Sequence, residues 1–445
     1  MKKQVLSALA FCSALGIAQA QTDVTKEYLV NPSFETLKAA DGTTDVAVKT
    51  KLENGLYGWE ISKLLDNQFS NYQVESEASG SSTGIPANGI IKPSQGEFYY
   101  FNRQGWGNVD GSELKTSTSK NLPIGTYYAV IDYKAADFSN NNDASKSGTT
   151  IGIKAENATN ELLGENTAVR RAYSTLTSNS DPYMVNAAWN ELGTMFTVTE
   201  PTTVTISLVQ NMKNSGRSDI AWDNLRLYKI EDVSENAPMD VSGLITTSNY
   251  YAFGGWNIEG GNTFQVNTWS TEGENDGSGM TTPFIEDHVG KENKAANATI
   301  SHTVSHLIPG IYEVSGLIRV LNEAGGDTPS GATLYANEGS TNACNGEPCT
   351  NGVYGTYIVK GTVGTDGVLT FGIKVANANF NWVSFKNFKL QYLGAASIEQ
   401  LQATLQEKIE EAKAYAENCP KGIAAIVNAA ITQGDNAQPT EESLN

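Results

Sequence analysis

The sequence predicts an all-β protein, built from two tandem β-sandwich modules and ending in a short α-helical hairpin. Three observations lead to this prediction. Four motifs recur along the chain in one order, the hydrophobic period within each copy is two, and the period changes after Gly394. With 445 residues the chain is long enough for two or three domains, each with a hydrophobic core of its own.

The composition excludes some classes of function. Lys and Arg number 30 and Asp and Glu number 49, so the formal net charge is -19. A chain this acidic repels phosphate backbones, which excludes general nucleic-acid binding. Three His and four Cys supply few ligands for zinc and few groups for histidine-dependent catalysis.

The first twenty residues have the pattern of a secretory signal peptide. Two lysines open it, residues 5–17 are apolar, and Ala18-Gln19-Ala20 is a small-x-small cleavage site. No later run approaches the ~20 apolar residues that a transmembrane helix needs. We therefore expect a secreted protein, in the periplasm, at the cell surface or outside the cell, without a transmembrane segment.

An internal repeat then organises the chain. Each copy has an early Gly-Trp pair, and three longer motifs recur: 122–133 at 307–318, 192–208 at 354–373, and 221–228 at 384–391. Four motifs in one order predict two copies of one module, at residues 21–235 and 236–394.

Within each copy the residues alternate as they do in half-buried strands. Val204, Ile206 and Leu208 alternate with Thr and Ser, and turn signals such as Asp366-Gly367 separate the runs. Many short strands without helical periodicity between them predict a β-sandwich or jelly roll.

After Gly394 the period becomes helical. Ser397 and Gln400 have capping-box spacing, and the first apolar stripe ends at Pro420. A second stripe follows and is closed by Gly434. Two short helices bury little on each other, so residues 395–445 are interpreted as a helical segment, an incomplete three-helix bundle at the front of a longer protein. The alternative is a frayed natural C-terminus.

Three motifs carry a family resemblance. Leu29-Val-Asn-Pro-Ser-Phe-Glu35, Gly58-Trp59 and Ile220-Ala-Trp-Asp-Asn-Leu-Arg-Leu227 resemble the galactose-binding-like jelly rolls of carbohydrate-binding modules, nearest to the xylan- and glucan-binding families. The second copy, ending at Leu390, resembles the same module in secreted glycan-utilisation proteins of Bacteroidetes. The resemblance covers most of the mature chain and implies a polysaccharide or glycan as partner.

The resemblance also implies a structural calcium ion in the first copy. The family commonly holds it with the Glu of the opening motif and the Asp of the last strand, which are Glu35 and Asp223 here. Calcium prefers carboxylate and carbonyl oxygens. Lys386 stands at the position of Asp223 in the second copy, so we expect no calcium there. The alternative is that both acids are ordinary exposed residues.

Aromatic residues in loops are the candidate sugar platforms, because sugars present C–H faces to rings and hydroxyls to amides and charged groups. The candidate ligand-binding residues are Tyr100, Asn102, Arg103 and Trp106 in one stretch, Tyr183 and Trp189 in an insertion of the first copy, and Trp269 in the second. An alternative interpretation makes this stretch a strand, with Tyr99 and Phe101 on its buried face and Tyr100 exposed. The other tryptophans considered, Trp59, Trp222 and Trp256, are expected in the cores.

The cysteines and histidines predict little chemistry. Cys344 and Cys349 flank a short Gly/Asn loop and predict a local disulfide in an oxidising compartment, against the alternative of two inert thiols. His302 and His306 are interpreted as surface strand residues, about 13 Å apart at ~3.3 Å per residue and too distant to share an ion.

No run has a catalytic frame of the nucleophile-elbow, P-loop or dinucleotide type. The leading hypothesis is therefore non-catalytic carbohydrate binding, in which two weak sites gain avidity by being linked. Two alternatives stay open. The chain is the N-terminal part of a secreted glycoside hydrolase, lyase or esterase whose catalytic domain lies beyond residue 445, or it is an adhesin or spacer without ligand.

Overall fold

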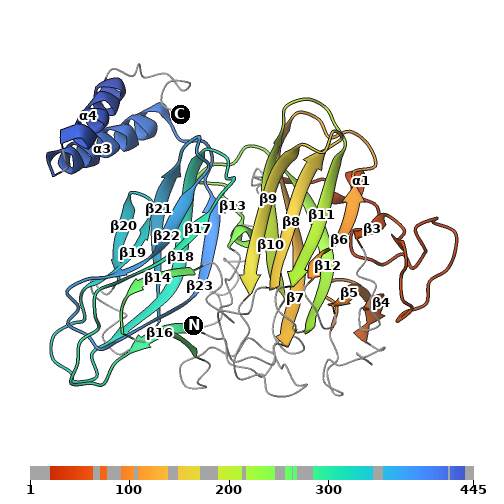
Figure 1. The fold of residues 1–445 in the computed structure, drawn as a ribbon, viewed down its shortest axis with the longest axis horizontal. Helices are drawn as coiled ribbons and strands as arrows, with labels where there is room; N and C mark the ends of the chain where they lie inside the picture. Colours follow the sequence, from red (N-terminus) through yellow and green to blue (C-terminus); the bar gives the residue numbers. More distant parts are fainter. Residues whose placement is uncertain are drawn as a thin grey trace, which may run out of the picture.

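The computed structural model describes residues 21–63, 71–77, 92–104, 109–138, 149–170, 189–212, 217–245, 256–262, 264–267, 284–343, 354–418 and 421–435. In these ranges four antiparallel sheets pair into two sandwiches that stand side by side, and a pair of helices follows (Figure 1). The predicted fold class is confirmed. The proposed signal peptide lies outside the described residues.

The first sandwich contains two sheets of six strands each. One has the order β10-β7-β12-β5-β4, with β1 paired to β12, and the other has the order β2-β3-β6-β11-β8-β9. The first sheet comprises β1 (Gln21–Asp23), β4 (Asn71–Ser76), β5 (Phe98–Gln104), β7 (Gly125–Phe138), β10 (Asn190–Val198) and β12 (Arg217–Ile230). The second comprises β2 (Gly55–Leu56), β3 (Trp59–Lys63), β6 (Val109–Ser117), β8 (Thr149–Asn157), β9 (Leu162–Arg170) and β11 (Val204–Met212); the short helix α1 spans Thr25–Tyr28.

The second sandwich repeats this strand order. Its sheets run β15-β16-β23-β18-β21, with β13 paired to β23, and β14-β17-β22-β19-β20. The first sheet comprises β13 (Met239–Asp240), β15 (Gln265–Asn267), β16 (Phe284–His288), β18 (Gly310–Leu321), β21 (Gly355–Val363) and β23 (Trp382–Tyr392). The second comprises β14 (Trp256–Gly260), β17 (Ala298–Val304), β19 (Ala332–Ala336), β20 (Gly339–Ala343) and β22 (Leu369–Val375).

The repeat extends to an irregularity in the long strand at the centre of each copy. The register of β12 against β7 shifts between Asp223 and Arg226, and that of β23 against β18 shifts beside Asn387. Asn224 and Asn387, equivalent in the sequence repeat, both have left-handed backbones, with φ of 54° and 52°. Asn adopts this conformation more readily than most residues, so both copies retain the same β-bulge.

Alternation along the strands builds the two cores. Val204, Ile206 and Leu208 of β11 are buried in the first sandwich, as their spacing predicts. The three tryptophans expected in the cores, Trp59, Trp222 and Trp256, are all buried.

One histidine prediction is wrong. His302 is buried, packed between the rings of Trp256 and Phe371 at centroid distances of 5.2 and 5.5 Å, and is not a surface residue. His306 is exposed but follows the end of β17 in a left-handed conformation. The period-two pattern placed His302 on a strand correctly, but composition alone does not show that its neighbours are aromatic.

A short connector joins the sandwiches. We call residues 239–245, which contain β13 and the 3-10 turn η2 (Ser242–Leu244), the joint. Val241, Leu244 and Ile245 of the joint are buried in one continuous apolar cluster with residues of both sandwiches. Within this cluster the Tyr312 hydroxyl of the second sandwich donates to Met195 Sδ of the first at 3.5 Å.

The C-terminal segment forms helices α3 (Ile398–Glu417) and α4 (Lys421–Asp435). The predicted capping box is confirmed: Ser397 accepts the Gln400 N–H, and the Gln400 side chain accepts the Ser397 N–H. Gly434 lies inside α4 rather than closing it, packed against Ile409 of α3. None of the described helices is long and apolar enough to cross a lipid bilayer.

Candidate functional site

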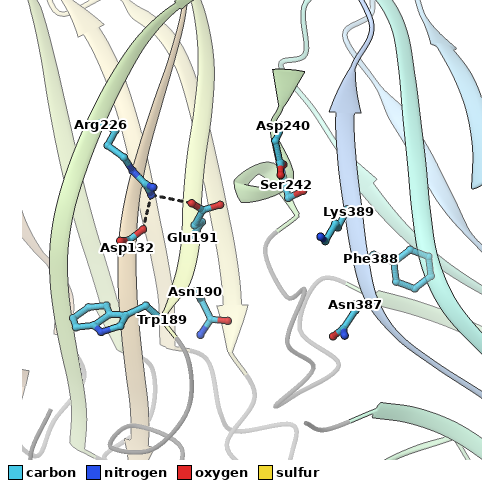
Figure 2. A pocket seen from close by; sticks show the side chains of 10 residues that line it. All are labelled: Asp132, Trp189, Asn190, Glu191, Arg226, Asp240, Ser242, Asn387, Phe388 and Lys389. Carbon is cyan, nitrogen blue, oxygen red and sulfur yellow. Dashed lines mark hydrogen bonds and ion pairs between the residues drawn. The ribbon is translucent and has the colours of Figure 1, made fainter. Parts of the chain in front are cut away.

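A cleft between the two sandwiches is lined by charged, amide and aromatic side chains. Its volume is about 470 Å³, within the range of ~300–1,000 Å³ typical of ligand sites. The residues that line it come from both copies of the module (Figure 2); they are Asp132, Trp189, Asn190, Glu191, Arg226, Asp240, Ser242, Asn387, Phe388 and Lys389.

Two further hollows lie on the outer sheets, one of about 580 Å³ beside Trp59 and one of about 730 Å³ beside Tyr335. Each belongs to a single sandwich. Of the three, the cleft alone contains a residue that the sequence predicted as a sugar platform, Trp189.

Three neighbouring strands of the first sandwich form one wall of the cleft. Asp132 lies on β7, Glu191 on β10 and Arg226 on β12, so their side chains project from three neighbouring strands of one sheet. The Arg226 guanidinium donates through Nη2 to Asp132 Oδ1 and, at 2.9 Å, to Glu191 Oε1. Burial raises the pKa of Glu191, and the positive charge of Arg226 opposes that rise.

Asn224 of the β-bulge in the first copy, together with Ser94, holds the Asp132 carboxylate of this ion pair by hydrogen bonds. Asn224 Nδ2 donates to Asp132 Oδ2 at 3.0 Å, and the Ser94 hydroxyl donates to the same oxygen at 2.7 Å. Asp132 is therefore held by three donors in a buried position. A carboxylate satisfied in this way is a fixed part of the wall.

Trp189 extends the same wall beside β10. Its indole Nε1 donates to the Lys92 carbonyl at 3.0 Å, and its ring meets Tyr99 edge-on at 6.2 Å. Lys134 Nζ lies 5.4 Å from the ring centroid. The ring is half-buried and held in one orientation, as a stacking platform for a sugar requires.

The joint and the second sandwich supply the rest of the cleft. Asp240 and Ser242 come from the joint, where the Asp240 carboxylate accepts the Ser242 N–H at 2.9 Å. Asn387 and Lys389 come from β23, and their side chains point across the cleft towards the first sandwich (Figure 2). Lys389 is exposed and, among the described residues, makes no hydrogen bond or ion pair.

The two residues predicted as calcium ligands bind one loop through its amide groups. Asp223 is fully buried, and its Oδ2 accepts the N–H groups of Ser94 and Gln95 at 2.9 and 3.0 Å. Glu35 accepts the N–H groups of Glu97 and Phe98, each at 3.1 Å. We call residues 94–98 the clamped loop.

The clamped loop bears on the calcium prediction. Burial raises the pKa of Asp223 to about 7, against hydrogen bonds from the loop that lower it. The hydrogens that point at both carboxylates repel a cation, so this arrangement does not present the oxygen ligands that calcium needs. Among the described residues no group of three or more metal-binding side chains occurs. Calcium binding stays a prediction. It requires the clamped loop to present its carbonyl oxygens, instead of its N–H groups, to the ion between Glu35 and Asp223.

The other predicted ligand residues lie elsewhere. Tyr100 is buried in the core and stacks on Phe34 at 5.7 Å, which corrects the expectation of a loop aromatic. Asn102 is also buried, and its Nδ2 donates to Ser112 and Gln210. The alternative is confirmed in that Tyr99 and Phe101 are buried on strand β5, but its expectation of an exposed Tyr100 is wrong. Arg103 is a residue of β5; Trp106, Tyr183, Trp269, Cys344 and Cys349 lie outside the described residues.

The lysine that replaces Asp223 in the second copy takes a different environment. Lys386 is buried, and its Nζ lies 4.5 Å from the ring centroid of Tyr354. Arg319 lies over Trp382 at 4.0 Å on the same sheet, and the Trp382 indole donates to Glu286 at 2.8 Å. This cluster was not predicted, because its members come from four separate strands or loops that the sequence pattern does not bring together.

Of the residues that line the cleft, sequence reasoning found only Trp189. The charged residues that it missed are Asp132, Glu191, Arg226, Asp240 and Lys389. One signal was available: Arg226 and Lys389 occupy the same position of the repeated motif 221–228 and 384–391. That equivalence indicates importance in both copies, but it does not show that the two positions meet.

No family model and no curated protein matches the chain. Among solved structures, a family 61 carbohydrate-binding module in complex with β-1,4-galactotriose is similar with a TM-score of 0.26 and 13% identity, over 45% of this chain and 97% of that one. The Stig cyclase Fisc from Fischerella sp. TAU is similar with a TM-score of 0.28 and 14% identity, over 45% of this chain and 95% of that one. The CBM22-1 xylan-binding domain of Paenibacillus barcinonensis Xyn10C is similar with a TM-score of 0.22 and 8% identity, over 40% of this chain and 90% of that one.

Proposed function

We propose that the protein is a secreted, non-catalytic carbohydrate-binding protein. The observation that carries the proposal is the cleft, in which an oriented tryptophan lies beside carboxylates, a guanidinium group and an amide. Rings, carboxylates, guanidinium groups and amides are the groups that recognise the C–H faces and hydroxyls of sugars. The family resemblance of the sequence motifs supports the same function.

The proposal is tested by affinity gel electrophoresis of the full chain against galactan, xylan, mannan, β-glucan and polygalacturonate. We expect retardation by at least one polysaccharide. Trp189→Ala should weaken that binding about tenfold, equivalent to ~1.4 kcal/mol, because the stacking surface is removed. Trp189→Phe should retain most of the affinity.

The control is Tyr415→Ala, which removes an exposed ring on α3. Equal affinity of the wild-type protein, Trp189→Ala and Tyr415→Ala would contradict the role of Trp189. Lack of retardation by any polysaccharide would favour a spacer. Release of reducing ends from a polysaccharide by this chain alone would favour the enzymatic alternative.

A further inference from the structure

The cleft brings together the same position of the two repeated modules. Arg226 and Lys389 are equivalent in the repeat, each two residues after the asparagine of the bulge. Both line the cleft, one from β12 and the other from β23, and they belong to opposite walls (Figure 2). The cleft is thus lined by equivalent strands of two copies, with one cation from each.

The strand registers show that the two cations have different surroundings. In the first copy Asp223 pairs with Asp132, and Asp132 pairs with Glu191. In the second copy Lys386 pairs with Leu317, and Leu317 pairs with Thr356. Leu317 and Thr356 therefore occupy the positions of Asp132 and Glu191.

This substitution leaves Lys389 without the two carboxylates that neutralise Arg226. Arg226 donates through Nη2 to Asp132 and to Glu191, both within its own sandwich. Lys389 is exposed and, within the part of the chain that is described, has no ionic or hydrogen-bonding partner. An ammonium group that projects from a strand into a cleft presents three donors to whatever enters it.

The joint fixes the distance between the walls. Its buried residues Val241 and Leu244 pack with both sandwiches, and Asn166 of the first sandwich donates to the Leu244 carbonyl at 3.2 Å. Gly243 lies so close to Tyr128 that a Cβ would be 2.5 Å from the tyrosine hydroxyl. The cleft is therefore formed before a ligand arrives, which lowers the entropy cost of binding.

We propose that the cleft is one composite site, in which Lys389 of the second sandwich binds the ligand together with Trp189 and Glu191 of the first. This inference rests on the proposed carbohydrate-binding function and specifies its site. The second module then contributes half of a shared site rather than an independent one.

The charges of the cleft indicate a neutral oligosaccharide. Its lining includes the carboxylates of Asp132, Glu191 and Asp240 against the cations of Arg226 and Lys389, so negative charge is in excess and uronic acids are repelled. Carboxylate acceptors on one wall and ammonium and amide donors on the other match sugar hydroxyls, which donate and accept at once.

The test uses the full chain and the same five polysaccharides in affinity gels, followed by isothermal titration with the neutral one that binds best. Lys389→Ala should weaken binding at least fivefold. Its control is Lys360→Ala, which removes an exposed lysine from β21 of the same sheet. Lys360 pairs with Glu235 at 2.9 Å and does not line the cleft, so its loss should leave the affinity unchanged.

A second variant keeps Lys389 but gives it a partner. Thr356→Glu places a carboxylate at the position that Glu191 has in the first copy, on an exposed strand residue, and should weaken binding by occupying the ammonium. Addition of Lys389→Ala to Thr356→Glu should then cause little further loss. Thermal melting of each variant checks that it folds.

Each outcome separates the two proposals. Wild-type affinity of both Lys389→Ala and Thr356→Glu for a neutral polysaccharide would overturn the composite site and leave carbohydrate binding standing. Binding to polygalacturonate alone would overturn the neutral ligand class. Failure of the wild-type chain to bind any of the five would refute carbohydrate binding itself, and the composite site with it.

Discussion

At the scale of single residues, Asp223 shows how burial alters a carboxyl group. It is fully buried behind the clamped loop, and its pKa is raised to about 7 by burial. A carboxyl whose folded pKa exceeds its unfolded pKa stabilises the fold when protonated, and each unit of difference is worth about 1.4 kcal/mol. That contribution is present at pH below 4 and is lost as the pH rises towards and through 7.

We therefore expect the wild-type protein, in EDTA, to lose stability between pH 5 and pH 8 relative to Asp223→Asn, which cannot ionise. Thermal unfolding followed by circular dichroism at several pH values measures this difference. Asp327→Asn, at an exposed position, is the control and should follow the wild-type profile. Parallel profiles for the wild-type protein and Asp223→Asn would refute the expectation.

The same experiment tests the calcium prediction. Calcium binds only the ionised carboxylate, so a bound ion would abolish the loss of stability at higher pH. If added calcium leaves the melting temperature at pH 8 unchanged, Glu35 and Asp223 act only as acceptors for the clamped loop.

At the scale of elements, the joint determines whether the cleft exists. Gly243→Val would place side-chain atoms against Tyr128 and Val130, where even a Cβ lies 2.5 and 3.0 Å from existing atoms. Overpacking of this kind costs about 1–3 kcal/mol. We expect a lower melting temperature and weaker polysaccharide binding, although no residue that lines the cleft is changed.

The matched control is Gly364→Val, because the nearest atom to a Cβ there is 3.8 Å away. Small-angle scattering of both variants shows whether the sandwiches separate. A Gly243→Val protein that melts, scatters and binds like Gly364→Val would show that the joint does not hold the cleft in place.

The helical pair permits a more local prediction. Ser397 accepts the Gln400 N–H at 3.2 Å in the capping box that starts α3. Ser397→Ala should destabilise this end of the helix by about 1 kcal/mol, so that the amides of its first turn exchange hydrogen about fivefold faster. Ser397→Asp should exchange at the wild-type rate, and equal rates for all three proteins would contradict a role for the cap.

At the scale of the whole molecule, the sequence allowed the fold to be predicted but not the site. Alternation at Val204, Ile206 and Leu208 and the repeated motifs report local structure and duplication directly. The cleft depends on how two copies dock, and neither period nor composition encodes docking. Trp189 was found because it interrupts a polar insertion. Tyr100 misled because a strand buried on both faces has no alternation to reveal it.

Lys389 also shows that the sequence does not reveal which residues lie beside one another in the fold. Its equivalence to Arg226 was visible in the repeat, but its isolation became visible only when the strand registers placed Leu317 and Thr356 where the first copy has acids. A repeat alignment shows which residues correspond, and the registers show which of them have lost their neighbours.

The divergence of the two bulged strands has a consequence for how this protein evolves. Duplication first produces two identical modules, and recombination can transfer either of them alone into another gene. The first module has kept the carboxylates of Asp132 and Glu191, and the second presents to the first the ammonium of Lys389, which is unpaired among the described residues. Neither module can therefore replace the other. Recombination would then have to move the pair together, and selection would act on the tandem as a single inherited unit.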